Sequence, residues 1–298
     1  MTNSLKKNQK DRLALNVISL LVLSALALAC GLPFILVLSG SFSKESAIVR
    51  TGYGLLPKSF TLASYEMVFR FPTDILRAYG VTTVLTASGA FLSLFLVSMT
   101  AYALLRKDFR SRNFFALFFY FTTLFSGGLV PWYILMLRYL HMKNNYLALL
   151  FPLLFNVFDL IIMRTFMQSI PDSLCESAKI DGAGEFTIYS RIYIPLSKSA
   201  LATIGLFVAL RYWNDWYNAM LFISDEKKYP LQYYLYTALN SMQAAKLAAE
   251  RAGVVLKDVP TQTFKLAMTV VATGPIVLLY PFLQKYFIRG ITIGAVKG

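Results

Sequence analysis

The sequence predicts an all-α integral membrane protein with six transmembrane helices in a single domain covering residues 1–298. Hydrophobic residues make up 57% of the chain and charged residues only 15%, which is more apolar and less charged than an average soluble domain. Six mostly apolar stretches of about 20 or more residues are each long enough to cross a hydrocarbon core about 30 Å thick. Because a helix satisfies its own backbone hydrogen bonds in lipid, these stretches are expected to be helical.

The six predicted spans differ in how strictly they exclude charge. The first three and the last contain no Asp, Glu, Lys or Arg, whereas Asp159 interrupts the fourth span, and Arg211 and Asp215 interrupt the fifth. The spans run from Leu15 to Gly40, Tyr79 to Leu105, Phe114 to Leu137, Asn144 to Met163, Ser199 to Ile223, and Leu266 to Gln284.

Glycine and proline mark two spans in which the helix is expected to bend or break. Gly127-Gly128 with Pro131 lies in the third span, and Gly274-Pro275 with Pro281 lies in the sixth. Such interruptions are tolerated at membrane depth where neighbouring helices or water satisfy the freed backbone groups. Both places are therefore candidates for hinges or cavity walls.

The distribution of Lys and Arg predicts which side of the membrane each loop faces. Basic residues in short loops resist translocation, so the basic tail at residues 1–14 and the basic connection at 106–112 are predicted to be cytoplasmic. An even number of spans then places both termini in the cytoplasm. Residues 41–78 and 225–265 are predicted to lie on the opposite side.

Charge and cysteine content exclude several classes of function. The net charge of +14 is explained by basic residues beside the membrane, which meet anionic lipid headgroups. Nucleic acid is not an expected partner, because no compact basic and aromatic face stands apart from the spans. Cys30 and Cys175 alone provide no disulfide framework or Cys-rich metal site. No phosphate-binding Gly-x-x-x-x-Gly-Lys-Ser/Thr loop occurs, so we expect no ATPase site and no cofactor in this chain.

Residues 165–198, between the fourth and fifth spans, are predicted to form a cytoplasmic loop of two short helices. Ser173 and Glu176 have the spacing of a capping box, in which each side chain satisfies a free backbone donor of the other residue. Glu176 is therefore either a helix cap or a contact to a partner.

A tight turn is expected to separate these two helices. Gly182-Ala183-Gly184 interrupts the first helix, because glycine tolerates the backbone angles of a sharp turn. The second helix is predicted to run from Glu185 to Tyr193 and to stop at Pro195. A knob of this kind, protruding from a membrane protein, suits a groove in a soluble partner.

The spacing of five residues in this loop resembles the EAA loop of permease subunits in binding-protein-dependent ABC importers. The departures are mild: Ser177 replaces the usual Ala, and Ile194 stands where Leu is common. The matching positions are Glu176, Ala178, Gly182, Ile192 and Pro195.

Further segments are similar to sugar-importing permeases, and most of all to the second permease of systems for oligosaccharides or polysaccharide fragments. The resemblance implies the type I importer permease fold in the membrane of a bacterial cell. The segments are 125–131, 212–216, 229–232, Gly290 and 294–298.

The resemblance also implies partners. A second permease, expected to be a different chain, would complete the translocation path, and an extracytoplasmic sugar-binding protein would deliver the substrate. Two copies of a cytoplasmic ABC ATPase would bind ATP and Mg and receive the loop. Glu176 would contact the ATPase, Phe186 would be an apolar anchor, and the turn would consist of Asp181, Gly182 and Ala183.

The charges of the fifth span have two interpretations. An Arg inside a span costs about 2.5 to 3.5 kcal/mol on insertion scales, so it usually faces a partner helix or a water-filled cavity. Arg211 and Asp215 lie four residues apart and can pair on one helical face, and a Trp at a span end can be an interfacial anchor. Alternatively, this segment lines the path of a sugar with planar polar groups and aromatic faces. The residues concerned are Arg211, Trp213, Asn214, Asp215, Trp216 and Asn218.

Asp159 is predicted to face the helix bundle in a structural role. The external segment 225–265 contains an Ala-rich helical stretch, which either docks the binding protein or caps the bundle. A secondary transporter or a non-transporting membrane scaffold are the alternative classes. The knob-like loop argues against the first, and the polar cluster at 211–218 argues against the second.

Overall fold

The computed structural model describes residues 2–252 and 260–294, with side chains described at positions 12, 15–252 and 260–278. The described backbone is mostly helical and holds no β-strand beyond an isolated bridge between Ser43 and Phe60, which confirms the all-α prediction for these residues. The described residues form two compact parts, one drawn from 1–71 and 239–273 and the other from 72–238 and 274–298. A single domain over residues 1–298 stays a prediction.

The first part contains the N-terminal helix of the chain. Most apolar side chains of this helix between Leu15 and Leu38 are exposed, so it presents an apolar surface suited to lipid or to another chain. The helices of this part are α1 (Thr2–Ser41), α2 (Glu45–Thr51), α3 (Ala63–Val68), the end of α14 (Leu231–Arg251) and the start of α15 (Thr261–Gly294).

Glu45 fixes the beginning of α15. One carboxylate oxygen of Glu45 accepts the backbone N–H of Gln262 at 3.0 Å, and the other accepts the N–H of Thr263 at 2.9 Å. The first N–H groups of a helix have no partner within the helix, and its N-terminus attracts negative charge. A residue from far away in the sequence therefore caps this helix.

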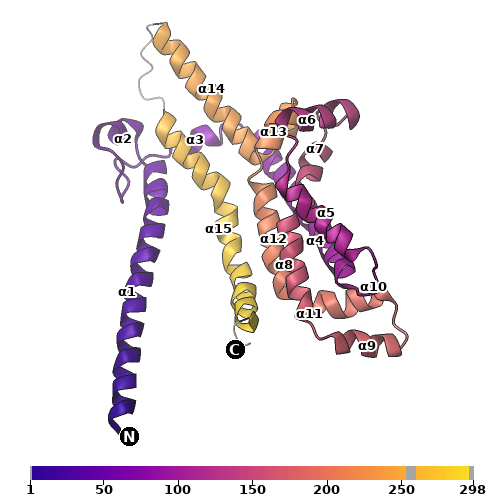
Figure 1. Ribbon diagram of the computed structural model, residues 1–298. Coiled ribbons are helices and arrows are strands. Elements are labelled where there is room, and N and C mark those ends of the chain that lie inside the picture. The colour runs from indigo at the N-terminus through magenta and orange to yellow at the C-terminus, as the bar shows by residue number, and fades with distance from the viewer. Residues whose placement is uncertain (1, 253–259, 295–298) are drawn as a thin grey trace. The chain divides into compact units, whose positions relative to one another are not determined.

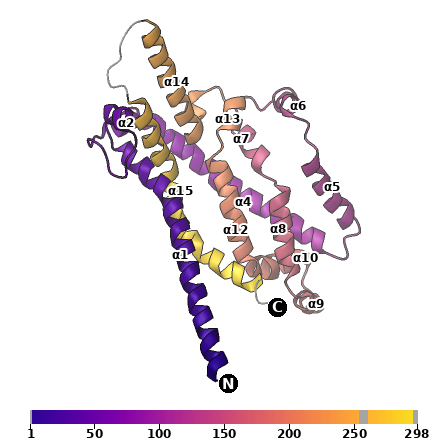
Figure 2. The ribbon, with the colours of Figure 1, turned by 60° about the vertical axis from the view of Figure 1, so that its left-hand side comes forward.

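The second part contains the helices that position the site. The helices α4, α8 and α12 lie side by side, with α9 to α11 at one of their ends and α6, α7 and α13 at the other (Figures 1 and 2). The elements are α4 (Pro72–Leu105), α5 (Arg112–Leu124), α6 (Leu129–Ile134), η1 (Leu135–Tyr139), α7 (Leu147–Leu150), η2 (Phe151–Leu153), α8 (Val157–Gln168), α9 (Asp172–Ile180), α10 (Glu185–Ile188), η3 (Tyr189–Tyr193), α11 (Ile194–Leu196), α12 (Lys198–Trp213), α13 (Tyr217–Phe222) and η4 (Glu226–Lys228).

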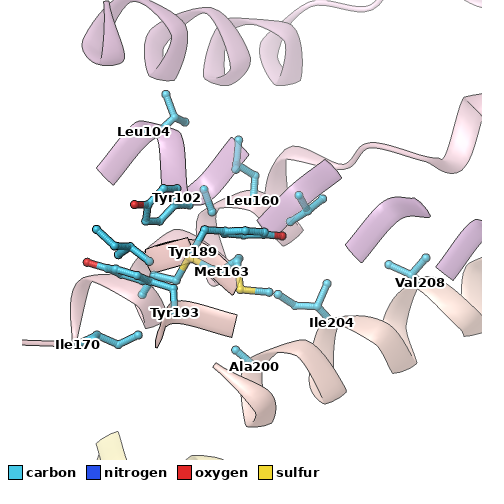
Figure 3. Packing of buried hydrophobic residues seen from close by; sticks show 14 of the residues in the cluster. Tyr102, Leu104, Leu160, Met163, Ile170, Tyr189, Tyr193, Ala200, Ile204 and Val208 are labelled. Atoms are coloured by element: carbon cyan, nitrogen blue, oxygen red, sulfur yellow. The ribbon is translucent and has the colours of Figure 1, made fainter. Parts of the chain in front are cut away.

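The core of this part fills the space between α4, α8 and α12. Each helix contributes small or aliphatic side chains that are almost fully buried, as Figure 3 shows for several of them. Close packing of this kind makes the three helices a stable support for the loop that follows α8. The members include Val97 and Ala101 of α4, Leu160 and Met163 of α8, and Ile204 and Val208 of α12.

Three of the predicted spans are bent or broken in the structure. Two helical stretches, Leu15–Ser41 and Pro72–Leu105, are long and apolar enough to cross a membrane by themselves. Three bent pairs bring the number to five within the described residues if each pair is one span. The pairs are Arg112–Leu124 with Leu129–Tyr139 at 113°, Leu147–Leu153 with Val157–Gln168 at 49°, and Glu185–Leu196 with Lys198–Trp213 at 81°.

The interruptions have local causes. The break expected at Gly127-Gly128 is confirmed, since Gly128 has a φ of 81° that favours glycine. The fourth predicted span is not one helix, because Asn156 has an extended backbone and its side chain accepts the N–H of Phe158 to start α8. By contrast, α15 continues through Gly274-Pro275 without a break.

The fifth predicted span, Ser199 to Ile223, is not one continuous helix either, so this prediction is also wrong. Its main helix, α12, ends at Trp213, and α13 begins only at Tyr217. The sixth span, Leu266 to Gln284, falls within α15, of which the side chains are described as far as Leu278. The tail at 295–298, which contributes to the resemblance, lies outside the described residues.

Candidate functional site

The first helix of the loop, α9, starts two residues earlier than a capping box requires. Pro171 is the N-cap residue, with extended angles (φ −60°, ψ 131°), and no side chain caps this end. Ser173 therefore lies inside the helix, and the predicted capping box with Glu176 is wrong. The reason is that proline fixes its own φ and disfavours a helical conformation at Ile170 before it. Glu176 is exposed, which leaves it accessible to a partner.

The turn after α9 is a Schellman motif. Gly182 has a φ of 78°, its N–H donates to the carbonyl of Lys179 at 3.0 Å, and the N–H of Ala183 donates to the carbonyl of Ala178 at 2.9 Å. These two bonds satisfy carbonyl groups that the end of a helix leaves free, and the left-handed position favours glycine. Ala178 and Ala183 also pack against the core. The turn predicted at Asp181, Gly182 and Ala183 is thereby present.

The second helical run of the loop extends past Pro195. It consists of α10, the π-helical turn η3 and α11, and it ends at Leu196 rather than before the proline. Proline lacks an N–H and clashes with the carbonyl four residues earlier in a regular α-helix. The wider π-helical turn before it separates these groups, so the helix continues. The prediction that Pro195 stops the helix is therefore wrong.

The buried face of the loop contacts α4 through tyrosines. Tyr189 and Tyr193 are almost fully buried, and their rings lie 5.5 Å and 5.0 Å from the ring of Tyr102 in α4 (Figure 3). The hydroxyl of Tyr189 also lies 2.8 Å from Oγ of Ser98. Ile192 is half-buried against the same core. Aromatic pairs in these orientations add attraction beyond their buried area.

The opposite surface of the loop exposes large apolar side chains. Ile180, the last residue of α9, is 87% exposed, and Phe186, near the start of α10, is 66% exposed. These two residues flank the Gly182 turn in the sequence, and Leu174 is also exposed. Exposed apolar surface often marks an interaction site, and these side chains suit an apolar groove in a partner.

Charged residues join the loop to the connection after α4. Arg106 donates to a carboxylate oxygen of Glu185 at 3.0 Å, and Tyr102 donates to the other oxygen of Glu185. Lys179 lies 3.1 Å from Glu185 and 2.9 Å from Asp108. We call these five residues the Glu185 clamp.

The Glu185 clamp keeps its acidic groups ionised. Partial burial raises the pKa of Glu185, but hydrogen bonds from Tyr102 and Lys179 and the charge of Arg106 outweigh it, so this pKa lies below its usual range. A hydrogen bond from Lys179 likewise lowers the pKa of Asp108. At neutral pH the two carboxylates of the clamp are therefore ionised.

The charges predicted in the fourth and fifth spans pair differently from the expectation. Arg211 of α12 donates to Oδ2 of Asp159 in α8, which is 1% exposed. Asp215 lies beyond the end of α12 and instead accepts the backbone N–H and the side-chain amide of Asn218, at 3.2 Å and 3.1 Å. The prediction that Arg211 and Asp215 pair within one helix is therefore wrong, because the helix needed to align them ends at Trp213.

The polar end of α12 divides into buried and exposed residues. Trp213 and Asn218 are buried, and the ring of Trp213 lies 6.3 Å from that of Tyr79 in α4. In contrast, Asn214 and Trp216 are exposed. The structure therefore does not bring all six predicted path residues to one open surface.

Residues of α14 extend the exposed part of this segment. The ring of Tyr236 stacks on that of Trp216 at 4.8 Å, and the amide of Gln232 donates to Asn214 at 3.3 Å. Neither residue was among the predicted site residues, although Gln232 lies in the similar segment 229–232, and Ile180 and the Glu185 clamp were not predicted either. A usable signal existed for the clamp, because a basic connection and a loop with acidic residues are both predicted on the cytoplasmic side.

In the described geometry, a two-helix loop is held at one end of three packed helices. A model of one protein family matches residues 109–293, and the chain belongs to this family of binding-protein-dependent transport system inner membrane components. The resemblance inferred from the loop is thereby confirmed.

Individual relatives extend the match over nearly the whole chain. Protein LplC of Bacillus subtilis (strain 168) is 40% identical over 293 residues, which cover 98% of this chain and 97% of that protein. The polygalacturonan/rhamnogalacturonan transport system permease protein YtcP of the same organism is 40% identical over 275 residues, covering 91% and 94%.

A solved structure shows the same fold. It is a crystal structure of a bacterial ABC transporter involved in the import of the acidic polysaccharide alginate. One chain of it is 31% identical to this chain with a TM-score of 0.77, covering 92% of this chain and 96% of that one. The described helices thus have the fold of an ABC importer permease.

Proposed function

We propose that this chain is a transmembrane subunit of an ABC importer for an oligosaccharide and that its loop from Glu176 to Pro195 docks on a cytoplasmic ATPase. The observation that carries the proposal is the two-sided character of the loop. One side is packed into the core through Tyr189 and Tyr193, while Ile180 and Phe186 are exposed beside a turn fixed by hydrogen bonds. A rigid support with an apolar tip is what a docking element requires.

The rest of the assembly follows from this proposal. Two copies of the ATPase bind ATP and Mg, a second permease chain completes the path, and an extracytoplasmic sugar-binding protein delivers the substrate. The chain spans a bacterial cell membrane six times with both termini in the cytoplasm, and α15 supplies the sixth span. Family membership and the density of basic residues at 1–14 and 106–112 support this arrangement.

The proposed path for the sugar includes the segment from Arg211 to Asn218. Binding sites for small molecules combine aromatic surfaces with a few placed polar groups, and Trp216, Tyr236 and Asn214 supply both kinds beside the break after α12. A substrate derived from a polysaccharide is supported by two similar proteins, a polygalacturonan/rhamnogalacturonan permease and an importer of alginate.

Ile180→Asp tests the docking proposal, with Val49→Asp as its matched control. Ile180 is 87% exposed and Val49 in α2 is 70% exposed, but Val49 belongs to the segment predicted to be external. Fully burying an aliphatic side chain stabilises by about 1.5–3 kcal/mol, so loss of Ile180 weakens a docked complex by roughly tenfold or more.

The measurement is the amount of ATPase that co-purifies with the permease from membranes. We expect Ile180→Asp to lose the ATPase and Val49→Asp to retain it, with equal amounts of both permeases in the membrane. Retention of the ATPase by Ile180→Asp at the wild-type level would overturn the proposal.

A further inference from the structure

The helix α4 is not adjacent in the sequence to the loop that we propose to dock on the ATPase. The loop follows α8 and precedes α12, and side-chain contacts join it directly to α4 and to the connection after α4. These contacts include the rings around Tyr102, the hydroxyls of Ser98 and Tyr189, the ion pair of Lys107 with Asp172, and the Glu185 clamp. Movement of the loop reaches α4 through these contacts as well as through the packing of α4 against α8 and α12.

The Glu185 clamp holds both sides of the Gly182 turn. Lys179 lies in the last turn of α9, before the glycine, and Glu185 is the first residue of α10, after it. Both side chains contact each other at 3.1 Å, and each also contacts the connection after α4, through Asp108 and Arg106 respectively. The two helices that flank the exposed tip are thus tied to the same short segment.

Arg106 and Tyr102 are the members of the clamp that are most shielded from solvent. The Arg106 side chain is 18% exposed, and its guanidinium lies 5.8 Å from the centre of the Tyr102 ring. Its other terminal nitrogen lies 2.9 Å from Sγ of Cys175, which is buried in α9. The side chains of Lys179, Glu185 and Asp108 are 40%, 51% and 73% exposed, so water screens the contacts of Lys179 with both carboxylates. The bond between Arg106 and Glu185 is therefore the clamp's one ion pair that joins a mostly shielded cation to the loop.

We propose that Arg106 and Glu185 are positioning residues that connect the loop mechanically to α4, an inference that rests on the proposed docking function. Their charge-assisted hydrogen bond, completed by the hydroxyl of Tyr102, fixes the distance between the loop and the end of α4. When the ATPase displaces the loop, α4 moves with it. Without the bond, the ATPase still docks on the exposed tip, but its motion is no longer passed on fully.

The test compares Arg106→Glu and Glu185→Arg in proteoliposomes that contain the whole transporter. The readout is the number of substrate molecules transported per ATP hydrolysed, together with ATPase co-purification. We expect each variant to lower this ratio roughly fivefold or more while the ATPase stays bound. Arg110→Glu is the matched control, because Arg110 is exposed in the same connection, and it should leave the ratio unchanged.

A conservative variant keeps the test decisive if a charge reversal fails to accumulate in the membrane. Glu185→Gln retains the shape of the side chain and an acceptor for Tyr102 but removes the charge opposite Arg106, so the ratio should still fall. A wild-type ratio in Glu185→Gln and in the single reversals would overturn the inference. If Ile180→Asp also retains the ATPase, the docking proposal fails; if only the clamp variants behave as wild type, the clamp inference alone fails.

Discussion

Replacing Gly182 with alanine tests the backbone conformation of the loop's turn without disturbing any side-chain contact. Gly182 has a φ of 78°, and a Cβ added to it would meet no other atom within 4 Å. The free energy that Gly182→Ala costs the turn therefore comes from the left-handed conformation alone, about 1–2 kcal/mol for an L-residue. Gly184→Ala is the matched control: that position is equally open, but its φ of −71° suits alanine.

Hydrogen exchange of the backbone amides measures this cost directly. The N–H of residue 182 donates to Lys179 and that of Ala183 donates to Ala178, so both exchange only when the turn opens. A loss of 1–2 kcal/mol corresponds to roughly 5- to 30-fold faster exchange at these amides in Gly182→Ala. We expect Gly184→Ala to exchange at the wild-type rate.

The same variants connect the turn to transport. If the turn orients the exposed tip, Gly182→Ala should lower substrate uptake per ATP hydrolysed while the permease remains in the membrane, and Gly184→Ala should not. Equal exchange rates in the two variants would refute the assignment of the strain to Gly182. Faster exchange with unchanged uptake would refute the role of the turn in coupling.

Three further predictions concern the intramembrane charges, the two tryptophans and pH. Asp159→Asn should reduce the free energy of unfolding by about 3–5 kcal/mol, because it leaves Arg211 charged without its partner. Adding Arg211→Gln should restore part of the lost melting temperature, measured by thermal melting in detergent. Trp216→Ala should slow uptake without lowering the melting temperature, whereas Trp213→Ala, at a buried position, should lower the melting temperature by itself. The pKa of Glu185 is depressed in the folded protein, so its ionisation stabilises the folded state above the ordinary pKa of 4.5, and this stabilisation is lost as the pH falls through the lower folded-state pKa. Titration of Glu185 should therefore cause no change in transport per ATP between about pH 6 and 8. A clear change over this range in wild type that Glu185→Gln abolishes would contradict this prediction.

The parts of the structure that the sequence predicts best are governed by neighbouring residues. The turn at Gly182 and the break at Gly128 both depend on a backbone conformation that glycine favours, so a short segment suffices to locate them. The positions of the loop's matched residues relative to one another also follow from their spacing along the chain. Proline was harder to interpret: Pro171 shifts the start of α9, and Pro195 is accommodated by a π-helical turn instead of ending the helix.

The parts that sequence reasoning missed depend on residues distant in the chain. Arg211 and Asp215 have the spacing of a helical pair, but the pair requires the helix to continue past Trp213, which it does not. The actual partner, Asp159, comes from another helix. The Glu185 clamp likewise joins residues 79 positions apart, and neither hydropathy nor local spacing specifies which basic residue meets which acid.

The described contacts give α4 a role beyond that of a packed span. It runs without a break from Pro72 to Leu105, so its backbone bonds resist bending between the two ends. Near one end, Tyr102 contacts the loop; near the other, Tyr79 lies against Trp213, and Thr82 accepts the N–H of Leu231 at the start of α14 at 2.7 Å. Tyr79 and Tyr102 lie 23 positions apart in α4, which corresponds to about 35 Å of helix.

Movement of α4 is also closely tied to α12. A Cβ placed on Gly89 of α4 would lie 2.3 Å from the ring of Tyr212, so the two helices are in tight contact at this point. The hydroxyl of Tyr212 in turn donates to the carbonyl of Leu150 at 2.7 Å. Interfaces this close do not slide continuously, so α4 and α12 are expected to shift together. A displacement that enters through the Glu185 clamp would therefore reach the polar break after α12 by way of α4 as well as along the chain itself.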